Sequence, residues 1–250
     1  MRLAAIFSLM GIAWLCLAAE YHAHPWAWLY LWPGVSFLIV GAAYGWFGAA
    51  VLGKRADGTI SPWVVVLLLP YFLLAWFAWT LHGWIARPER SHEIIPGLWV
   101  GRRARAADLP DGIACVVDMT SEFWEPAAVR AGRTYLCLPT LDHHVPGEQA
   151  FSALVRQVAG LDRPVYVHCA HGYGRAAMLA AAVMIERGLA SGLEDAEQIL
   201  KQSRPKVHLA RRQRELIRRV ARASTTVKPS NAASGSGSGA LASVPRGALP

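Results

Sequence analysis

The chain has 250 residues, of which 54% are hydrophobic, and a formal net charge of +8 at pH 7. Residues 1–86 hold most of the eleven tryptophans and few charges, whereas the remainder is polar and rich in arginine. A basic chain favours an anionic partner, such as lipid headgroups or a phosphorylated substrate. We find no recognisable nucleic-acid-binding motif, so the composition predicts two unlike regions and no nucleic-acid partner.

The first region contains three apolar stretches, residues 3–19, 34–52 and 62–84. Each is long enough to cross a bilayer, and tryptophans flank the second and third, as in a membrane-interface belt. The first stretch could instead be the core of a signal peptide. Buried helices of a soluble domain do not account for so much uncharged sequence. We therefore expect residues 1–86 to form a transmembrane helical region of about three spans, which makes this a multi-pass integral membrane protein.

The orientation in the membrane rests on two weak signals. With three spans, Arg2, Lys54 and Arg55 lie on one side, and a slightly larger group of basic residues near the spans lies on the other. That group is Arg87, Arg90, Arg102, Arg103 and Arg105. The four cysteines show neither a CxxC pair nor zinc-ligand spacing, and a reactive cysteine needs a reducing compartment. Together these signals predict a cytoplasmic C-terminal domain.

Residues 87–223 alternate between strand-like and helix-like patterns. We expect strands within 94–101 and at 113–118, 134–138 and 165–169, and helices at 147–161, 176–186, 193–203 and 209–222. This alternation predicts an α/β domain with a mostly parallel central sheet flanked by helices. Residues 224–250 are rich in Ser, Gly, Ala and Pro, and are predicted to be a disordered tail.

The last predicted helix combines one apolar stripe with many arginines. Leu209, Leu216, Ile217 and Val220 form the stripe, and arginines cover the rest of the surface. One interpretation is the solvated face of a packed helix. The other is contact with anionic lipid, which is plausible for a domain already tethered to a bilayer.

Residues 164–176 carry the clearest chemical signal. A short apolar strand ends at Cys169, two glycines follow, and Arg175 opens an alanine-rich helix. A loop at a helix N-terminus directs backbone N–H groups inward and favours bound anions, which also favours the thiolate form of the cysteine. An arginine can bind two oxygens of one oxyanion. The segment therefore predicts a phosphate cradle facing a thiolate nucleophile, with a buried structural cysteine as the alternative.

The spacing His168-Cys169-five residues-Arg175 resembles the signature of cysteine-dependent phosphatases, the protein tyrosine and dual-specificity group, over roughly residues 92–220. This resemblance implies a dual-specificity-like fold, Cys169 as the nucleophile, Arg175 as the clamp on phosphate, and an aspartate on another loop as general acid. His168 would support the loop. The substrate phosphate would contact the loop residues Ala170, His171, Gly172, Tyr173, Gly174 and Arg175.

Asp142 is the candidate general acid. It follows a predicted strand end, so it lies at the same sheet edge as Cys169. Its alternative role is to cap the following turn. His143 and His144 could also act as acids or bind a metal, but adjacent side chains point apart and a third ligand is not evident. The sequence therefore predicts no metal and no other cofactor.

Glu122 is a further carboxylate after a strand end and a candidate supporting residue. The segment 119–123 resembles a substrate-side loop of the phosphatidylglycerophosphate phosphatase branch of the family. Residues 205–208, Pro-Lys-Val-His, show a similar short match to that branch.

Ala176 departs from the family pattern, which usually has Ser or Thr directly after the arginine. That hydroxyl stabilises the leaving cysteine when the phosphoenzyme is hydrolysed, and its loss should slow this step by about tenfold to a thousandfold.

The sequence thus predicts a membrane-anchored phosphatase that hydrolyses phosphomonoesters through a cysteinyl-phosphate. The substrate would be a protein phosphorylated on tyrosine, serine or threonine, or a phospholipid monoester. The alternatives are a phosphate-binding pseudophosphatase with little turnover, which Ala176 favours, and a redox or sulfur-transfer enzyme, which the arginine-closed loop disfavours.

Overall fold

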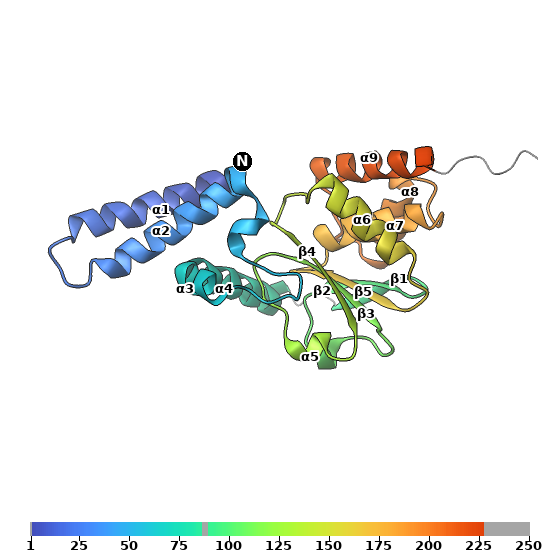
Figure 1. Ribbon diagram of the computed structural model, residues 1–250, viewed down its shortest axis with the longest axis horizontal. Coiled ribbons are helices and arrows are strands. Elements are labelled where there is room, and N and C mark those ends of the chain that lie inside the picture. Colours follow the sequence, from blue (N-terminus) through green and yellow to red (C-terminus); the bar gives the residue numbers. More distant parts are fainter. Residues whose placement is uncertain (1, 87–89, 228–250) are drawn as a thin grey trace, which may run out of the picture.

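The computed structural model describes residues 2–86 and 90–227. Figure 1 shows a helical hairpin that projects from a layered α/β domain. The hairpin consists of α1 (Arg2–Glu20) and α2 (Trp28–Ala42). The chain then passes through a π-helical turn, η1 (Ala43–Phe47), and a 3-10 turn, η2 (Ala49–Leu52), and continues with α3 (Pro62–Leu67) and α4 (Leu69–Ala86) beside the domain.

Glycines allow the two hairpin helices to approach closely. A Cβ atom at Gly34 would lie 2.6 Å from Cδ2 of Leu15, and one at Gly41 would lie 2.5 Å from Oγ of Ser8. Neither position can therefore hold a larger residue without moving the opposite helix. Close packing over small residues is typical of helix pairs in membranes.

The α/β domain contains a five-stranded sheet in the order β1-β2-β5-β3-β4. The strands are β1 (Ser91–Ile95), β2 (Leu98–Arg102), β3 (Cys115–Thr120), β4 (Thr134–Thr140) and β5 (Val165–Cys169). Only the β1–β2 hairpin is antiparallel, which confirms the predicted mostly parallel sheet. The separate edge strand β1 was not predicted, because Ser91–Glu93 is polar and lacks the apolar pattern of a buried strand.

Helices cover both faces of this sheet (Figure 1). One face packs against α6 (Glu148–Ala159), α7 (Arg175–Glu186) and α8 (Leu193–Ser203), and α9 (Arg211–Val227) packs on the outer side of these helices. The other face is covered by η3 (Ala106–Asp108) and α5 (Ala127–Arg130). Residues 175–184 of α7 are all buried, so this helix forms the centre of the core. The last helix continues to Val227, into the segment predicted to be disordered, and 228–250 lie outside the described residues.

Two helical segments, Arg2–Glu20 and Trp28–Phe47, are long and apolar enough to cross a membrane. The third predicted span does not meet this test among the described residues. Its sequence is divided between α3 and α4, and α4 contacts the α/β domain: the Trp79 indole N–H donates a hydrogen bond of 2.9 Å to the carbonyl of Ala170. Three spans are therefore not confirmed.

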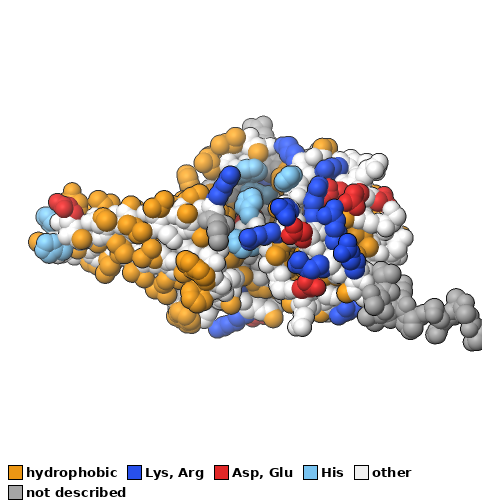
Figure 2. All heavy atoms as spheres, turned by 90° about the horizontal axis from the view of Figure 1, so that it is seen from above, with side chains coloured by type: hydrophobic (Ala, Val, Ile, Leu, Met, Phe, Trp, Pro, Cys, Tyr) orange, Lys and Arg blue, Asp and Glu red, His pale blue; other side chains and the backbone are white. Residues whose placement is uncertain are grey.

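The basic face of α9 is largely neutralised by ion pairs. Arg214 binds Glu197 at 2.5 Å, and similar pairs join α9 to the neighbouring helices α8 and α6. These are Arg218 with Glu194 and Arg219 with Glu148. Figure 2 likewise shows acidic side chains among the basic ones on the domain, whereas the hairpin is covered by hydrophobic side chains. The structure therefore favours the solvated-face interpretation of this helix.

Candidate active site

Cys169 lies at the end of β5, where the loop to α7 curls around its sulfur. The backbone N–H of Gly172 donates a hydrogen bond of 3.2 Å to Sγ of Cys169. Gly172 has φ +77°, and a Cβ there would lie 2.5 Å from the carbonyl group of Gly101, so only glycine fits. Tyr173 is held on the outer side, with the Arg204 guanidinium 5.1 Å from its ring centre.

Arg175 is buried and held by a planar pair of hydrogen bonds. Its Nη1 and Nη2 donate to the two Glu122 oxygens at 2.9 and 2.7 Å, and Nη1 also donates to the Thr140 carbonyl at 2.7 Å. Burial alone would raise the pKa of Glu122, but the guanidinium outweighs it and holds that pKa below its usual value. Both groups therefore stay charged, and Glu122 fixes the orientation of the fork that would bind phosphate.

The structure brings the predicted general acid to this arginine. Oδ1 of Asp142 lies 3.3 Å from Nη2 of Arg175, and 47% of the Asp142 side chain is exposed. This exposure suits a group that must meet an incoming substrate. His143 follows with φ +59° and a largely exposed side chain, 3.6 Å from Asp142.

The loop that carries Asp142 is tied to the helical region. Nδ1 of His144 lies 3.2 Å from the Asp142 carbonyl, and Nε2 lies 3.1 Å from the Tyr44 carbonyl, so the ring can donate to either one. Leu141 is buried in the core of the helical region. The position of the candidate acid thus depends on residues far away in sequence, which the sequence analysis did not identify.

The loop between Cys169 and Arg175 also contacts α4. The rings of His82 and His171 lie 4.3 Å apart, next to the hydrogen bond from Trp79 to Ala170. Burial lowers the pKa of His171 to about 4, so this loop residue is uncharged at neutral pH. A cavity of about 490 Å³ lies between the loop and the N-terminal helices.

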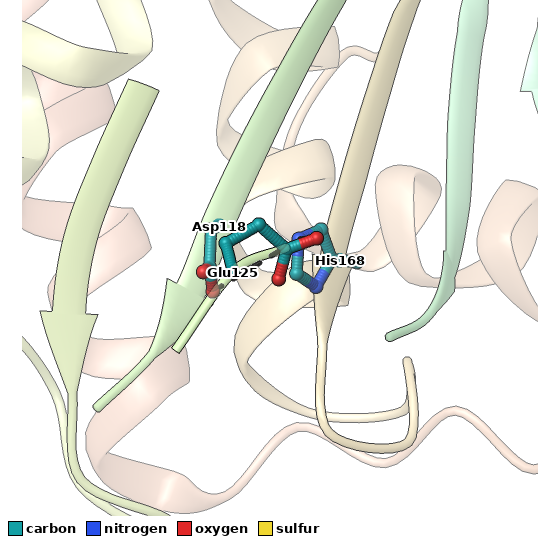
Figure 3. A group of neighbouring side chains, drawn as sticks. All are labelled: Asp118, Glu125 and His168. Atoms are coloured by element: carbon teal, nitrogen blue, oxygen red, sulfur yellow. Dashed lines mark ion pairs between the residues drawn. The ribbon is translucent and has the colours of Figure 1, made fainter. Parts of the chain in front are cut away.

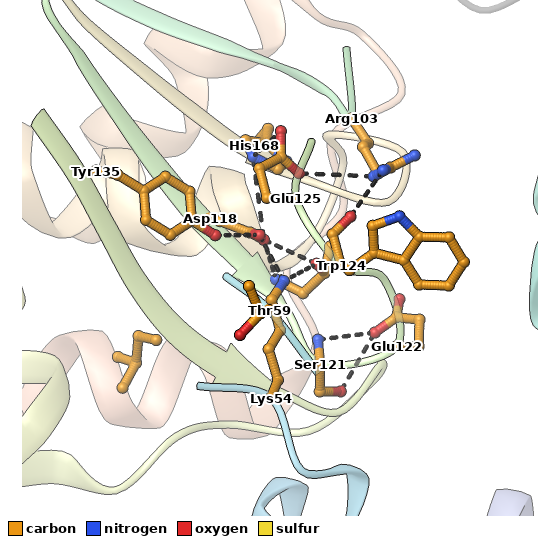
Figure 4. A network of polar contacts seen from close by, with 12 residues as sticks. Lys54, Thr59, Arg103, Asp118, Ser121, Glu122, Trp124, Glu125, Tyr135 and His168 are labelled. Atoms are coloured by element: carbon orange, nitrogen blue, oxygen red, sulfur yellow. Dashed lines mark hydrogen bonds and ion pairs between the residues drawn. The ribbon is translucent and has the colours of Figure 1, made fainter. Parts of the chain in front are cut away.

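Lys54, from the segment after η2, reaches into the α/β domain toward Asp118 near the end of β3 (Figure 4). Its Nζ donates to Oδ2 of Asp118 at 2.5 Å and to the Thr120 hydroxyl at 2.7 Å, and the side chains of this ion pair have no exposed surface. The Tyr135 hydroxyl donates to the same carboxylate at 2.8 Å. In the sequence, the Lys54-Arg55 pair is a basic pair within a region that has few other charges, which indicates membrane topology but not a buried ion pair.

His168 points toward Asp118 and Glu125 (Figure 3), with its Nε2 4.0 and 3.9 Å from their carboxylate oxygens. The potential ligand atoms of these three buried residues lie within 4.8 Å of one another, a spacing that could hold a metal ion. The Lys54 ammonium, however, already supplies positive charge at Asp118. Burial lowers the pKa of His168 to about 4, so the ring is neutral at neutral pH. We assign no ion to this cluster.

Glu125 makes the stability of the domain depend on pH. Burial first, and then the charge of Asp118, raise its pKa to about 8. The folded state therefore holds a proton that the unfolded state releases, so stability falls as pH rises toward 8. Between pH 6.5 and 8, above the usual pKa of histidine, we expect unfolding free energy to fall by about 1 to 2 kcal/mol. Urea titrations of the full-length protein, read by pulse proteolysis, measure this.

Glu125→Gln is the control for this pH effect, because an amide of the same shape does not titrate. We expect its unfolding free energy to stay level over the same pH range. Equal slopes in the two proteins would show that another group is responsible.

Comparison with known proteins is consistent with this geometry. Residues 105–189 match the family described as polymorphic toxin system, DSP-PTPase phosphatase. No curated protein sequence matches the chain. Among solved structures, PTPMT1 in complex with PI(5)P is 23% identical, with 55% of this chain and 98% of that chain covered and a TM-score of 0.49. Tk-PTP in its active form is 20% identical, and the match covers 53% of this chain and 96% of that chain with a TM-score of 0.47.

A third similar structure is the human tyrosine phosphatase-like serine/threonine/tyrosine-interacting protein, 22% identical, with 52% and 94% covered and a TM-score of 0.46. The segment that matches the family contains the loop from His168 to Arg175, on which the resemblance was based. Over residues 105–189 the α/β domain is therefore similar to dual-specificity-like phosphatases of the cysteine-dependent superfamily.

Proposed function

We infer that this protein is a membrane-anchored phosphatase that hydrolyses phosphomonoesters through a cysteinyl-phosphate intermediate on Cys169. The observation that supports this most directly is the convergence of three groups at the end of β5. The sulfur of Cys169 accepts a loop N–H, Glu122 orients the Arg175 guanidinium, and Asp142 lies 3.3 Å from that guanidinium. Together they supply a nucleophile, a phosphate clamp and a proton donor.

The proposed reaction has two steps. In the first, the Cys169 thiolate attacks phosphorus, the ester P–O bond breaks, and Asp142 gives its proton to the departing oxygen, so the alcohol leaves. In the second, water attacks the phosphorus and transfers a proton to the Asp142 carboxylate, while the P–S bond breaks and its electron pair returns to Cys169. The products are the alcohol, inorganic phosphate and the starting thiolate, so the reaction needs only the phosphomonoester and one water molecule.

The role of Asp142 is tested by the dependence on the leaving group. In full-length protein in detergent, Asp142→Asn should lower kcat/KM about a hundredfold for alkyl phosphates, whose leaving oxygen needs a proton. The loss should be less than about tenfold for p-nitrophenyl phosphate, whose leaving group is stable as an anion. Steady-state phosphate release measures both. His143→Asn is the neighbouring control and should change neither rate by more than about twofold. Equal losses for both substrates in Asp142→Asn would indicate a structural role.

A second candidate function is phosphate binding with little turnover. The absence of a hydroxyl at Ala176, which is fully buried at the start of α7, supports it. Such a protein would form the cysteinyl-phosphate and hydrolyse it slowly. Release of the leaving group separates the two functions, because a binding module would release about one equivalent per Cys169 in a burst and then only a slow further amount.

The hairpin also bears on localisation. If α1 and α2 span the bilayer and α4 does not, then Arg2, Lys54 and Arg55 lie on the same side as the α/β domain. The far turn of the hairpin, residues 21–27, contains no lysine or arginine. Under the positive-inside rule this arrangement supports a cytoplasmic domain, in keeping with a thiolate that must stay reduced.

A further inference from the structure

The cavity beside the catalytic loop has two chemically different walls. Glu122, Asp142 and His171 lie at the end where phosphate would bind. The opposite wall is formed by the N-terminal region and is mainly apolar, although Tyr44, Tyr71 and His82 also line it. Its residues include Leu3 and Phe7 of α1 and Leu74, Ala75 and Ala78 of α4. A ligand that fills this space must be polar at one end and apolar at the other.

The apolar wall is continuous with the apolar surface of the helical region. On α4, Leu73, Trp76 and Phe77 are exposed next to the residues that line the cavity. On α1, Ile6 and Leu9 are exposed beside Leu3 and Phe7. Figure 2 shows hydrophobic side chains along the hairpin and onto its junction with the domain. A chain that leaves the cavity along these helices would therefore stay in apolar surroundings.

We propose that this cavity binds the hydrocarbon chain of a lipid phosphomonoester, with the phosphate at Cys169 and the chain along α1 and α4. The assignment rests on the phosphatase function proposed above and names its substrate class. Each methylene group buried against this wall improves binding. A phosphopeptide would instead place backbone N–H and C=O groups against apolar side chains, where they would lack hydrogen-bond partners. The helical region is thus part of the substrate site as well as an anchor.

The test measures binding without requiring turnover. Alkylphosphonates of increasing chain length carry an equivalent head group and no cleavable ester. They should protect Cys169 of the full-length protein from alkylation by iodoacetamide. We expect the concentration for half-protection to fall by at least about tenfold from the shortest to the longest chain. Inorganic phosphate has no hydrocarbon chain, so its protection of Cys169 shows whether the phosphate-binding loop is intact.

Two adjacent leucines provide a matched pair of variants. Leu74 lines the cavity, whereas Leu73 is 58% exposed and is not among the lining residues. Leu74→Trp should fill the apolar space and remove the dependence on chain length, whereas Leu73→Trp should retain it. Protection by inorganic phosphate should be unchanged in both. Ala78→Phe fills the same space from the next turn of α4 and replaces Leu74→Trp if that variant does not fold.

Several outcomes would overturn the proposal. These are protection that does not vary with chain length in the unmodified protein, equal effects of Leu73→Trp and Leu74→Trp, or a phosphotyrosine peptide that protects better than the longest alkylphosphonate. Failure of the phosphatase function gives a different pattern. In that case chain-dependent protection would remain, but no phosphomonoester would be hydrolysed.

Discussion

Replacement of Cys169 by serine is expected to lower phosphate release by at least about 10³-fold, because the hydroxyl is not ionised at neutral pH and is a much weaker nucleophile. The loop itself should survive, since Gly172 and Arg175 keep their backbone positions and Glu122 still holds the guanidinium. Inorganic phosphate should therefore still bind. Rapid acid quenching with ³²P-labelled substrate should show label on the unmodified protein and none on Cys169→Ser.

Cys16→Ser is the matched control for this variant, because Cys16 is exposed on α1 and remote from the loop. It should retain full activity and labelling. Arg175→Lys should also lose about a hundredfold or more, because an ammonium cannot form the paired hydrogen bonds that the guanidinium makes with Glu122. Unchanged phosphate release in Cys169→Ser would end the cysteinyl-phosphate mechanism.

Lys54→Met is expected to destabilise the α/β domain by about 3 to 5 kcal/mol, although residue 54 belongs to the helical region. The substitution keeps most of the side-chain volume but leaves the buried Asp118 carboxylate without its ammonium partner. It also removes the hydrogen bond from Lys54 to the Thr120 hydroxyl. Thr120 lies two residues before Glu122, which orients Arg175, so we expect kcat to fall as well. Urea titration with pulse proteolysis measures stability, and phosphate release measures kcat.

Arg55→Met is the control for this prediction, because Arg55 is the next residue and is exposed. It should change stability by no more than about 0.5 kcal/mol. Adding Asp118→Asn to Lys54→Met should restore at least half of the lost stability, since the buried charge is then removed. Equal stability of the Lys54→Met and Arg55→Met proteins would show that the pair contributes little.

The sequence by itself determined the local chemistry of the site. Cys169, the glycines and Arg175 lie within one short segment, and the requirement for a positive φ at Gly172 is a property of the loop alone. The strand before this loop is predicted by its alternating apolar residues, and the helix after it by its alanine-rich composition. The position of Asp142 near Arg175 was also predictable, because parallel strands end at the same edge of a sheet.

Only the tertiary structure decided what surrounds that chemistry. Lys54 and Asp118 are 64 residues apart, and Trp79 and Ala170 are 91 residues apart, so no local pattern relates them. Hydropathy measures how apolar a helix is but not whether its face meets lipid, protein or a ligand. The apolar residues of α4 therefore predicted a third span. In the folded chain the same helix contacts the loop after Cys169 and lines the cavity beside it, and a third span is not confirmed, because burial depends on which distant surfaces the fold brings together.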